Sequence, residues 1–245
     1  MTCENEKKFI RTRAMLGTDG MKNIFKSHIA VFGIGGVGSY VCEALARSGI
    51  GEITIVDNDE VSESNINRQL YALCSTAGKS KVEIAKARML DINPELKINI
   101  FKTFFCEETL NQFDFSSFDY VADCIDSVSS KLLLIETCKK NNVKIISAMG
   151  AGNKLDPCQF EVADISETSV CPLCRVIRQE LKKRNIKELK VVYSKEKPLT
   201  PVYENEKDTE LKAGKPAPAS IAFVPPVMGL IMAGVIIKEA AGINN

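Results

Sequence analysis

The chain has 245 residues, of which 45% are hydrophobic, and its 32 Lys and Arg against 31 Asp and Glu leave a formal net charge of +1. This length and apolar content allow a full α/β core and favour one large domain over two small ones. The near-zero charge excludes binding of nucleic acid through the field of the whole molecule, so such a partner would need a local basic patch.

Hydrophobic periodicity predicts that strands and helices alternate through the first 150 residues. An amino-terminal helix comes first, and the remaining elements are strands at 28–32, 53–56, 97–101, 120–122 and 144–147 and helices at 39–47, about 80–90 and 129–141. This order indicates an α/β fold: a Rossmann-like, doubly wound, mainly parallel sheet with helices on both faces and right-handed crossovers.

The second half is less regular. Residues 158–200 hold extended segments around a basic helix, which predicts added antiparallel strands that cover a substrate groove. Residues 203–219 are polar, charged and rich in proline, and we expect a mobile loop there. We therefore expect a single domain over 1–245, with a nucleotide-binding core at about 20–150 and a substrate-covering, carboxyl-terminal helical part at about 151–245.

Residues 221–237 contain no charge. A membrane-spanning helix needs about 20 apolar residues, and this run of 17 is interrupted by two prolines and two glycines. The sequence favours a helix that begins at Pro225 and Pro226 and packs in the core or in a dimer interface, with small residues allowing close contact, over a membrane span.

A glycine-rich turn follows the first strand and opens the first helix of the alternating series. It reads GIGGVGS, with Gly33, Gly35, Gly36 and Gly38, and Asp57 ends the second strand about 20 residues further on. Such glycines permit a tight turn and let the backbone approach phosphates at the helix start, while the acidic residue binds a ribose. The spacing predicts a mononucleotide-like or dinucleotide-like site.

Cations downstream of this turn distinguish between NAD and ATP. Arg68 and Lys81 could neutralise a triphosphate, which a nicotinamide enzyme does not need. Asp123 and Asp126 follow the strand at 120–122, and this aspartate pair could hold magnesium at the carboxyl edge of the sheet. The alternative is that Asp126 caps the helix that begins near Ser127.

The nine cysteines and the amino terminus MTCENEKK, which lacks the apolar core of a secretory signal, predict a reduced, cytoplasmic chain. Four cysteines fall in apolar segments and are expected in the core, namely Cys42, Cys74, Cys124 and Cys138. None stands beside a histidine or a helix start that would activate it, although Cys158 and Cys171 remain formal candidates for a nucleophile.

The chain resembles the ThiF/MoeB/HesA group, the bacterial relatives of ubiquitin-activating enzymes, and within it the tRNA threonylcarbamoyladenosine dehydratase family. The motifs shared with the group are GIGGVGS, DNDEVSESNINRQ, GKSK, INP and DCID. Those of the dehydratase branch are RTRAMLG at 11–17, SAMGAGNKLDP at 147–157, VVYSKEKP at 191–198 and SIAFVPPVMGLIMAG at 220–234.

The resemblance implies a site for ATP and Mg²⁺. The nucleotide-binding positions it implies are Gly33, Gly35, Gly36, Gly38, Asp57, Asp59, Asn65, Asn67, Arg68, Gln69, Lys81 and Asp126. Arg68, Lys81 and Asp126 would be catalytic, with Asp126 holding magnesium. Arg11 would enter the neighbouring subunit's site, which implies a homodimer, although Arg11 and Arg13 alone are typical of solvated charges on a first helix.

The activity implied is a ligase-type one: ATP adenylates the threonyl carboxylate of the modified adenosine in tRNA, and the carbamoyl group then closes the ring. Proximity is already supplied within one substrate. The implied partners are the tRNA and, as a further possibility, a sulfur-mobilising or electron-transfer protein. A local basic run could contact tRNA or be a solvated helix face. It comprises Arg175, Arg178, Lys182, Lys183, Arg184, Lys187, Lys190, Lys195 and Lys197.

Three rival functions remain at this point. The first is adenylation of a ubiquitin-like sulfur carrier, whose activating enzymes carry a zinc site with two CxxC motifs. CPLCR, with Cys171 and Cys174, resembles its first half, but no cysteine follows and the one histidine, His28, lies in a predicted strand. We expect no zinc site, with a metal completed by Cys158 or a partner chain as the alternative. The others are a nucleotide-holding regulatory module and an NAD-dependent enzyme.

Overall fold

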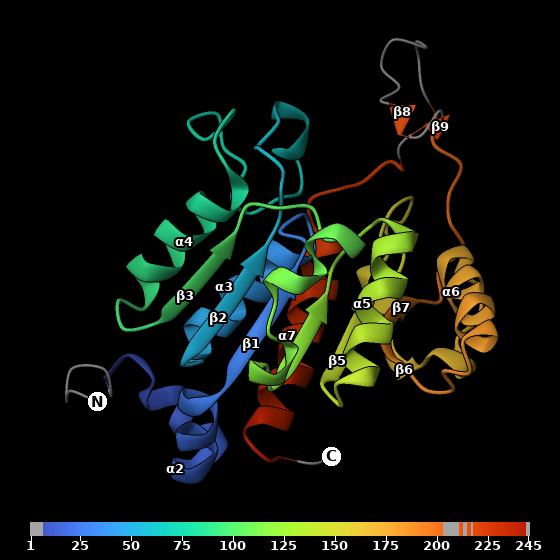
Figure 1. The fold of residues 1–245 in the computed structure, drawn as a ribbon. Helices are drawn as coiled ribbons and strands as arrows, with labels where there is room; N and C mark the ends of the chain where they lie inside the picture. Colours follow the sequence, from blue (N-terminus) through green and yellow to red (C-terminus); the bar gives the residue numbers. More distant parts are fainter. Residues whose placement is uncertain (1–6, 203–210, 213–214, 217, 244–245) are drawn as a thin grey trace.

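The computed structural model describes residues 7–202, 211–212, 215–216 and 218–243. Its centre is a seven-stranded sheet of order β3-β2-β1-β4-β5-β7-β6 (Figure 1). The strands are β1 (His28–Phe32), β2 (Glu52–Val56), β3 (Lys97–Phe101), β4 (Tyr120–Asp123), β5 (Lys144–Ala148), β6 (Phe160–Asp164) and β7 (Lys190–Ser194). All neighbours pair in parallel except β6, which is antiparallel to β7. The predicted α/β class is confirmed.

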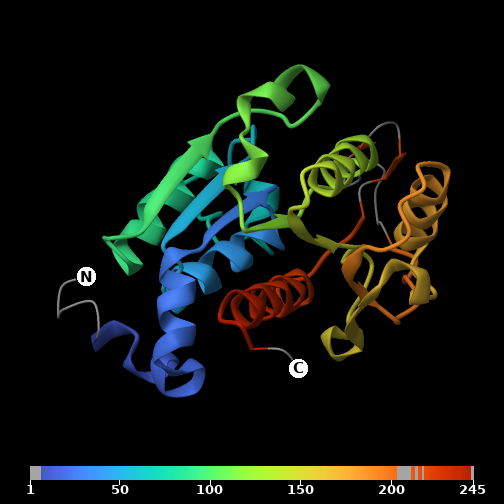
Figure 2. The same ribbon diagram turned by 60° about the horizontal axis from the view of Figure 1, so that its bottom comes forward.

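Helices cover both faces of this sheet. They are α2 (Ile10–Lys26), α3 (Gly38–Ser48), α4 (Lys81–Ile92), α5 (Val128–Lys140), α6 (Pro172–Lys183) and α7 (Val224–Ala240). Figure 2 shows α7, in red, on one face and α5, in yellow-green, on the other. Side chains of β1 alternate between two cores: Ile29 and Val31 pack with α3 and α7, whereas Ala30 and Phe32 pack with α5. A strand buried on both faces therefore reads as a continuous apolar run.

The strand order reverses between β1 and β4. The chain runs from β1 outward through β2 to β3, then returns to the other side of β1 for β4 and β5. In sheets of this kind ligands bind at the carboxyl ends of the two strands that flank the reversal. The fold thus places its crevice at the ends of β1 and β4, where the glycine-rich turn and the DCID segment lie.

The second half contains the expected antiparallel pairing. Within 158–200, β6 pairs antiparallel with β7, and β7 also joins β5 in parallel. Helix α6 carries the chain back across the sheet before β7, as the parallel pair requires. Short 3₁₀ turns connect other elements, at Glu63–Asn65, Glu107–Gln112, Phe115–Ser117, Pro157–Gln159 and Ile165–Glu167.

The predicted mobile loop at 203–219 lies partly outside the described residues, at 203–210, 213–214 and 217. The described part of it contains a small antiparallel pair, β8 (Leu211–Lys212) with β9 (Lys215–Pro216). The mobility of this segment stays a prediction.

The uncharged carboxyl-terminal run forms α7, which begins with its two prolines as predicted. Met228, Met232 and Ile236 are fully buried, so the prediction of a helix packed in the core is confirmed. At Gly229 a β-carbon would lie 2.4 Å from the carbonyl oxygen of Val37, so only glycine allows α7 to approach α3 this closely. Within the described residues, no helix combines the length and apolar character needed to cross a bilayer.

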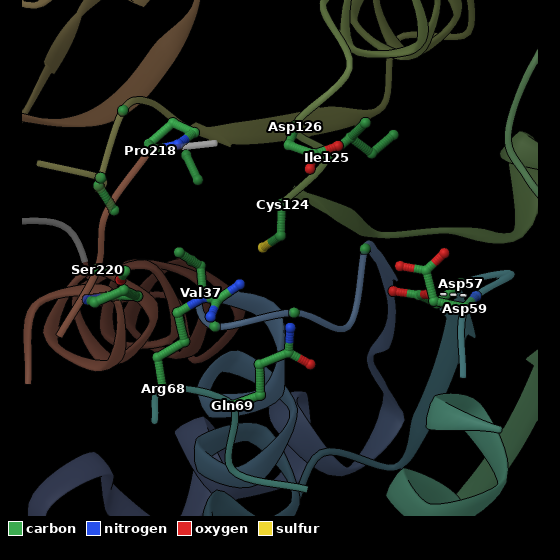
Figure 3. A pocket seen from close by; sticks show the side chains of 18 of the residues that line it. Val37, Asp57, Asp59, Arg68, Gln69, Cys124, Ile125, Asp126, Pro218 and Ser220 are labelled. Atoms are coloured by element: carbon green, nitrogen blue, oxygen red, sulfur yellow. Dashed lines mark hydrogen bonds between the residues drawn. The ribbon is translucent and has the colours of Figure 1, made fainter. Parts of the chain in front are cut away.

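The cysteine predictions hold for Cys42 and Cys138, which are buried. They are wrong for Cys74, which is exposed in the turns between Asn65 and α4. Cys124 is half-buried, because it follows β4 directly: its side chain packs against the core shared by α3 and α7 and also lines the crevice (Figure 3).

Candidate nucleotide-binding site

A cleft of about 1000 Å³ opens at the carboxyl ends of β1, β2, β4 and β5. Among the predicted nucleotide-binding residues, it is lined by Gly33, Gly35, Gly36, Asp57, Asp59, Asn65, Arg68, Gln69, Lys81 and Asp126. Figure 3 shows Asp57 and Asp59 on one side of this cleft and Pro218 and Ser220 on the other, with Arg68 and Asp126 between them. The fold therefore gathers segments spread over most of the chain around one elongated space.

The glycine turn is sterically required. Gly33 has φ of +88°, and a β-carbon there would lie 2.7 Å from the carbonyl oxygen of Cys124. A β-carbon on Gly38 would lie 1.9 Å from the carbonyl oxygen of Gly33, so Gly38 closes the turn although it does not line the cleft. Helix α3 starts after Val37 without a side-chain cap, and the N–H groups of Ser39 and Tyr40 donate to the carbonyl oxygens of Gly35 and Val37. The helix start therefore presents its positive dipole end to an anion beside the glycine turn.

Asp57 organises the edge of the cleft beside this turn. Its Oδ2 accepts a hydrogen bond from the Ile34 N–H at 2.6 Å, and its Oδ1 accepts one from the Asp59 N–H at 2.8 Å. Burial raises the pKa of Asp57, and the charge of Lys81 opposes that rise. A carboxylate oxygen keeps a second lone pair after one such bond, so Asp57 can still accept a ribose hydroxyl.

Lys81 is a largely buried cation beside Asp57. Its side chain is 6% exposed, and its Nζ donates to Asp59 Oδ2 at 2.7 Å. The Asp59 side chain is 57% exposed, so water can solvate that carboxylate if the ammonium turns to another anion. Lys81 is therefore a cation whose present partner is replaceable by a phosphate.

Arg68 is held in place by its own loop. Its Nη1 donates to the Ser64 carbonyl oxygen at 2.8 Å and to Asn67 Oδ1 at 2.9 Å. Asn67 in turn donates from Nδ2 to the Ser220 carbonyl oxygen at 3.1 Å. Asn67 does not line the cleft, so its arrangement suits positioning of Arg68 rather than contact with a ligand.

Asn65 shapes the same loop from within. Its Oδ1 accepts a hydrogen bond from the Ser62 N–H at 3.2 Å, which closes a capping box on the short 3₁₀ turn. Its side chain is half-buried and lines the cleft.

The aspartate pair after β4 divides into two roles, and the prediction that both face the nucleotide is wrong for Asp123. Asp123 is fully buried and accepts a hydrogen bond from the equally buried Lys131 at 2.7 Å. Asp126 is exposed at the cleft, and α5 takes Ser127, not Asp126, as its N-cap residue. A buried cation eight residues further along the chain could not be recognised as the partner of Asp123 from sequence alone.

The contacts that build the opposite end of the cleft were not predicted from the sequence. Asn153, with φ of +59°, donates its N–H to the Ala219 carbonyl oxygen and accepts the Ala219 N–H on its Oδ1, both at 2.7 Å. It also accepts the Leu199 N–H at 2.8 Å. Ser220 Oγ lies close by, buried and unpaired within the described part of the chain. This contact could not be recognised from the sequence, because Asn153 and Ala219 lie 66 residues apart.

Arg11 does not line the cleft of its own chain. Helix α2 packs at the far end of α7, where a β-carbon on Gly20 would lie 3.3 Å from Ala241 Cβ. The start of α7 is at the cleft, where Pro225 lies 3.2 Å from a β-carbon on Gly36. At 1.5 Å per residue, about 24 Å of helix separates these two contacts. Figure 1 shows α2 at the amino-terminal edge of the strands, and a role for Arg11 in a neighbouring subunit stays a prediction.

Much of the basic run is neutralised or used in structure. Lys183 and Arg184 pair with Glu180, Lys190 with Glu239 and Lys195 with Glu161. Arg178 donates to the backbone of Ile165 and Thr168. Four exposed cations of the run make no ion pair with any described residue, namely Arg175, Lys182, Lys187 and Lys197.

Cys171 and Cys174 are both buried, and Cys171 lines the cleft. The third cysteine considered with them, Cys158, is exposed. Within the described ranges, no three His, Cys, Asp or Glu side chains come close enough together to hold a metal ion.

Comparisons with known proteins bear on this cleft. Residues 9–245 match the ThiF family. The chain is 43% identical over 238 residues to a tRNA threonylcarbamoyladenosine dehydratase of Bacillus subtilis, covering 95% of this chain and 94% of that one. Crystal structures of the Escherichia coli tRNA N6-threonylcarbamoyladenosine dehydratase in complex with AMP and with ATP superpose with TM-scores of 0.89 and 0.88. Each is 30% identical and covers 98% of this chain and 96% of the other.

Proposed function

The chain belongs to the ThiF family, and from this premise we propose that it uses ATP to dehydrate N6-threonylcarbamoyladenosine in tRNA through an acyl-adenylate, giving the cyclic form of the modified base. It is an ATP-dependent adenylating enzyme that works as a single domain. The observation that carries this proposal is the near full-length similarity to a dehydratase, together with a cleft in which the glycine turn, Lys81, Arg68 and Asp126 converge.

The nucleotide occupies the end of the cleft near Asp57. The ribose hydroxyls approach the Asp57 carboxylate, and the phosphates lie over the glycine turn at the uncapped start of α3. Lys81 exchanges Asp59 for a phosphate oxygen, and Arg68 neutralises the phosphate chain from the opposite loop. Phe104, 49% exposed on the cleft wall, offers an apolar surface to the adenine.

The substrate carboxylate enters from the end of the cleft near Asn153 and Ser220. One carboxylate oxygen attacks the α-phosphorus, the bond to the bridging oxygen breaks, and pyrophosphate leaves. The cations at Arg68 and Lys81 act where negative charge develops on the departing group, so they stabilise the transition state more than bound ATP.

The second step needs no nucleophile from the enzyme. An atom of the carbamoyl group attacks the activated carbonyl carbon and the carbamoyl group releases one proton to solvent. The bond from that carbon to the adenylate oxygen breaks, and AMP leaves with one original carboxylate oxygen. The nucleophile and the electrophile belong to one substrate, so the cleft supplies orientation and excludes competing water. Gly152 and Pro218 line this end of the cleft and pack closely, since a β-carbon on Gly152 would lie 2.6 Å from Pro218 Cβ.

The donor set fits a magnesium ion at the phosphates. Mg²⁺ is bound in such sites by one or two carboxylates together with substrate phosphates and waters, and Asp126 presents an exposed carboxylate to the middle of the cleft. When bound there, the ion would neutralise charge on the phosphates.

We place two chains in the working assembly. Helix α7 carries no charged residue before its last turn, yet Leu230 on it is 48% exposed, and Ile10 and Met15 on α2 are 56% and 83% exposed. Apolar surface of this kind marks a protein interface, and a partner chain would bring its own Arg11 to a cleft that lacks one. The phosphates of the tRNA would be contacted by four exposed cations, namely Arg175, Lys182, Lys187 and Lys197. A protein that uses both tRNA and ATP is expected in the cytoplasm.

The test uses tRNA that carries threonylcarbamoyladenosine. The protein is incubated with this tRNA, ATP and magnesium, the tRNA is digested, and the nucleosides are weighed. The proposal predicts loss of one water from threonylcarbamoyladenosine that depends on ATP. AMP formation that requires a protein with a Gly-Gly carboxyl terminus, with unchanged tRNA, would support the adenylation of a sulfur carrier instead.

A further inference from the structure

The CPLC segment has no part in the proposed reaction. Cys171 is the N-cap residue of α6, and Cys174 lies one turn into the helix. They are 3% and 1% exposed, and the Cys174 thiol donates a hydrogen bond to the Cys171 sulfur. Two cysteines separated by two residues at a helix start have the CxxC spacing of dithiols that form an internal disulfide.

The surroundings favour Cys171 as the thiolate of this pair. The Cys174 thiol and the backbone N–H groups of Cys174, Gly150 and Leu173 all donate to its sulfur, which lowers the pKa of Cys171 to about 5. A β-carbon on Gly150 would lie 3.5 Å from this sulfur, so β5 ends in contact with it. The same hydrogen bond, burial and the charge of Cys171 raise the pKa of Cys174. Cys171 is thus the nucleophile of the pair, and Cys174 remains a protonated thiol that can react in a second step.

The backbone before the pair is strained. Val170 has φ of +61°, a conformation that β-branched residues rarely adopt, and it directly precedes Cys171. Arg178 fixes this turn from the helix side by donating to the Thr168 carbonyl oxygen and hydroxyl, both at 2.8 Å. Backbone strain of this kind persists where surrounding contacts determine it, and it clusters at functional sites.

We propose that Cys171 and Cys174 form a peroxide-reactive dithiol in the wall of the substrate end of the cleft. Cys171 lines the cleft, so a small oxidant reaches it there, whereas Cys174 does not. The Cys171 thiolate attacks one oxygen of hydrogen peroxide and the O–O bond breaks. Hydroxide departs, and Cys171 becomes a sulfenic acid. Cys174 sulfur then attacks that sulfur, its proton leaves with the hydroxyl group as water, and a disulfide remains. Two thiols lose two electrons in total, and the peroxide is reduced to two waters.

Peptide mapping of the whole protein tests this without any variant. Trypsin releases residues 155–175 as one peptide that holds Cys158, Cys171 and Cys174. The protein is treated with hydrogen peroxide, alkylated under denaturing conditions, and digested. The expected product carries one alkyl group, on Cys158, and lacks two hydrogen atoms, and reduction before alkylation restores three alkyl groups. Exposed Cys158 is the matched control in the same peptide.

A Cys174→Ser variant separates attack from resolution. Here peroxide is expected to leave Cys171 as a sulfenic acid that a dimedone probe traps, with Cys158 reacting more slowly. In the wild-type protein, alkylation of both Cys171 and Cys174 at peroxide levels that already oxidise Cys158 would overturn the proposal, and so would a disulfide that includes Cys158. The outcome does not depend on the dehydratase activity, since only the thiols are measured.

Discussion

Lys131 donates a hydrogen bond to Asp123 over 2.7 Å, and both side chains are completely buried. The same ammonium reaches the Ala148 carbonyl oxygen at 3.0 Å, and the other oxygen of Asp123 accepts the Ile125 N–H at 3.1 Å. This ion pair therefore joins the ends of β4 and β5 and shapes the turn that presents Asp126 to the cleft.

Lys131→Met should be strongly destabilising, because it leaves the Asp123 carboxylate buried without its partner. Breaking a buried pair from one side costs about 3–5 kcal/mol, whereas replacing both partners is often near neutral. Urea denaturation should show this loss for the single variant and recovery of most of it for Lys131→Met with Asp123→Leu. The surface variant Lys139→Met serves as the control, and a loss below about 1 kcal/mol for Lys131→Met would contradict the assigned role.

Asp126→Asn should lower AMP formation by on the order of a hundredfold while the melting temperature stays unchanged. The residue is exposed, so its change to the isosteric amide removes a charged ligand for the phosphate-bound cation from the surface of the cleft. Labelled ATP measures the product, and Asp91→Asn, an exposed carboxylate on α4, is the matched control. Wild-type turnover in Asp126→Asn would show that magnesium is held elsewhere.

Lys81→Met should reduce turnover by about 10²–10³-fold, because this ammonium faces the charge that develops on the phosphates. The stability should change by about 1 kcal/mol or less, since its partner Asp59 is 57% exposed and can be solvated. Turnover and denaturation are measured on the same preparation. Lys79→Met, an exposed neighbour, is the control, and an equal effect from both substitutions would remove the case for Lys81.

Mixed subunits test whether Arg11 acts across a dimer. Arg11→Ala and Lys81→Met chains should each be nearly inactive alone. A mixture of equal amounts should recover about a quarter of wild-type activity, because half of the dimers are mixed and each has one complete site. Dissociation and reassembly before the assay ensures exchange. Activity no higher than that of the separate variants would mean that Arg11 does not serve a partner.

The sequence allowed the frame of the fold to be predicted because the strands of the parallel sheet are short apolar runs separated by glycines and charges. Lys97–Phe101 and His28–Phe32 were located to the residue for this reason. The glycine turn likewise identified the nucleotide end of the cleft, since Gly33 and Gly38 meet steric requirements that no other residue satisfies.

Contacts between distant segments could not be predicted in this way. The sequence placed Asp123 with Asp126 because both end the same strand, and only packing reveals Lys131 beneath the first of them. The substrate end depends on Asn153 meeting Ala219, a contact set by the path of the chain between them. The parallel pairing of β7 with β5 was not predicted for the same reason, since it follows from the crossover through α6.

The most direct test of carboxylate adenylation is isotopic. Threonylcarbamoyladenosine in tRNA is prepared from threonine with ¹⁸O in its carboxyl group, and the products formed with ATP are analysed by mass spectrometry. The account predicts that one ¹⁸O appears in the phosphate of AMP and none in pyrophosphate. Appearance of the label in inorganic phosphate, with ADP as the nucleotide product, would contradict it.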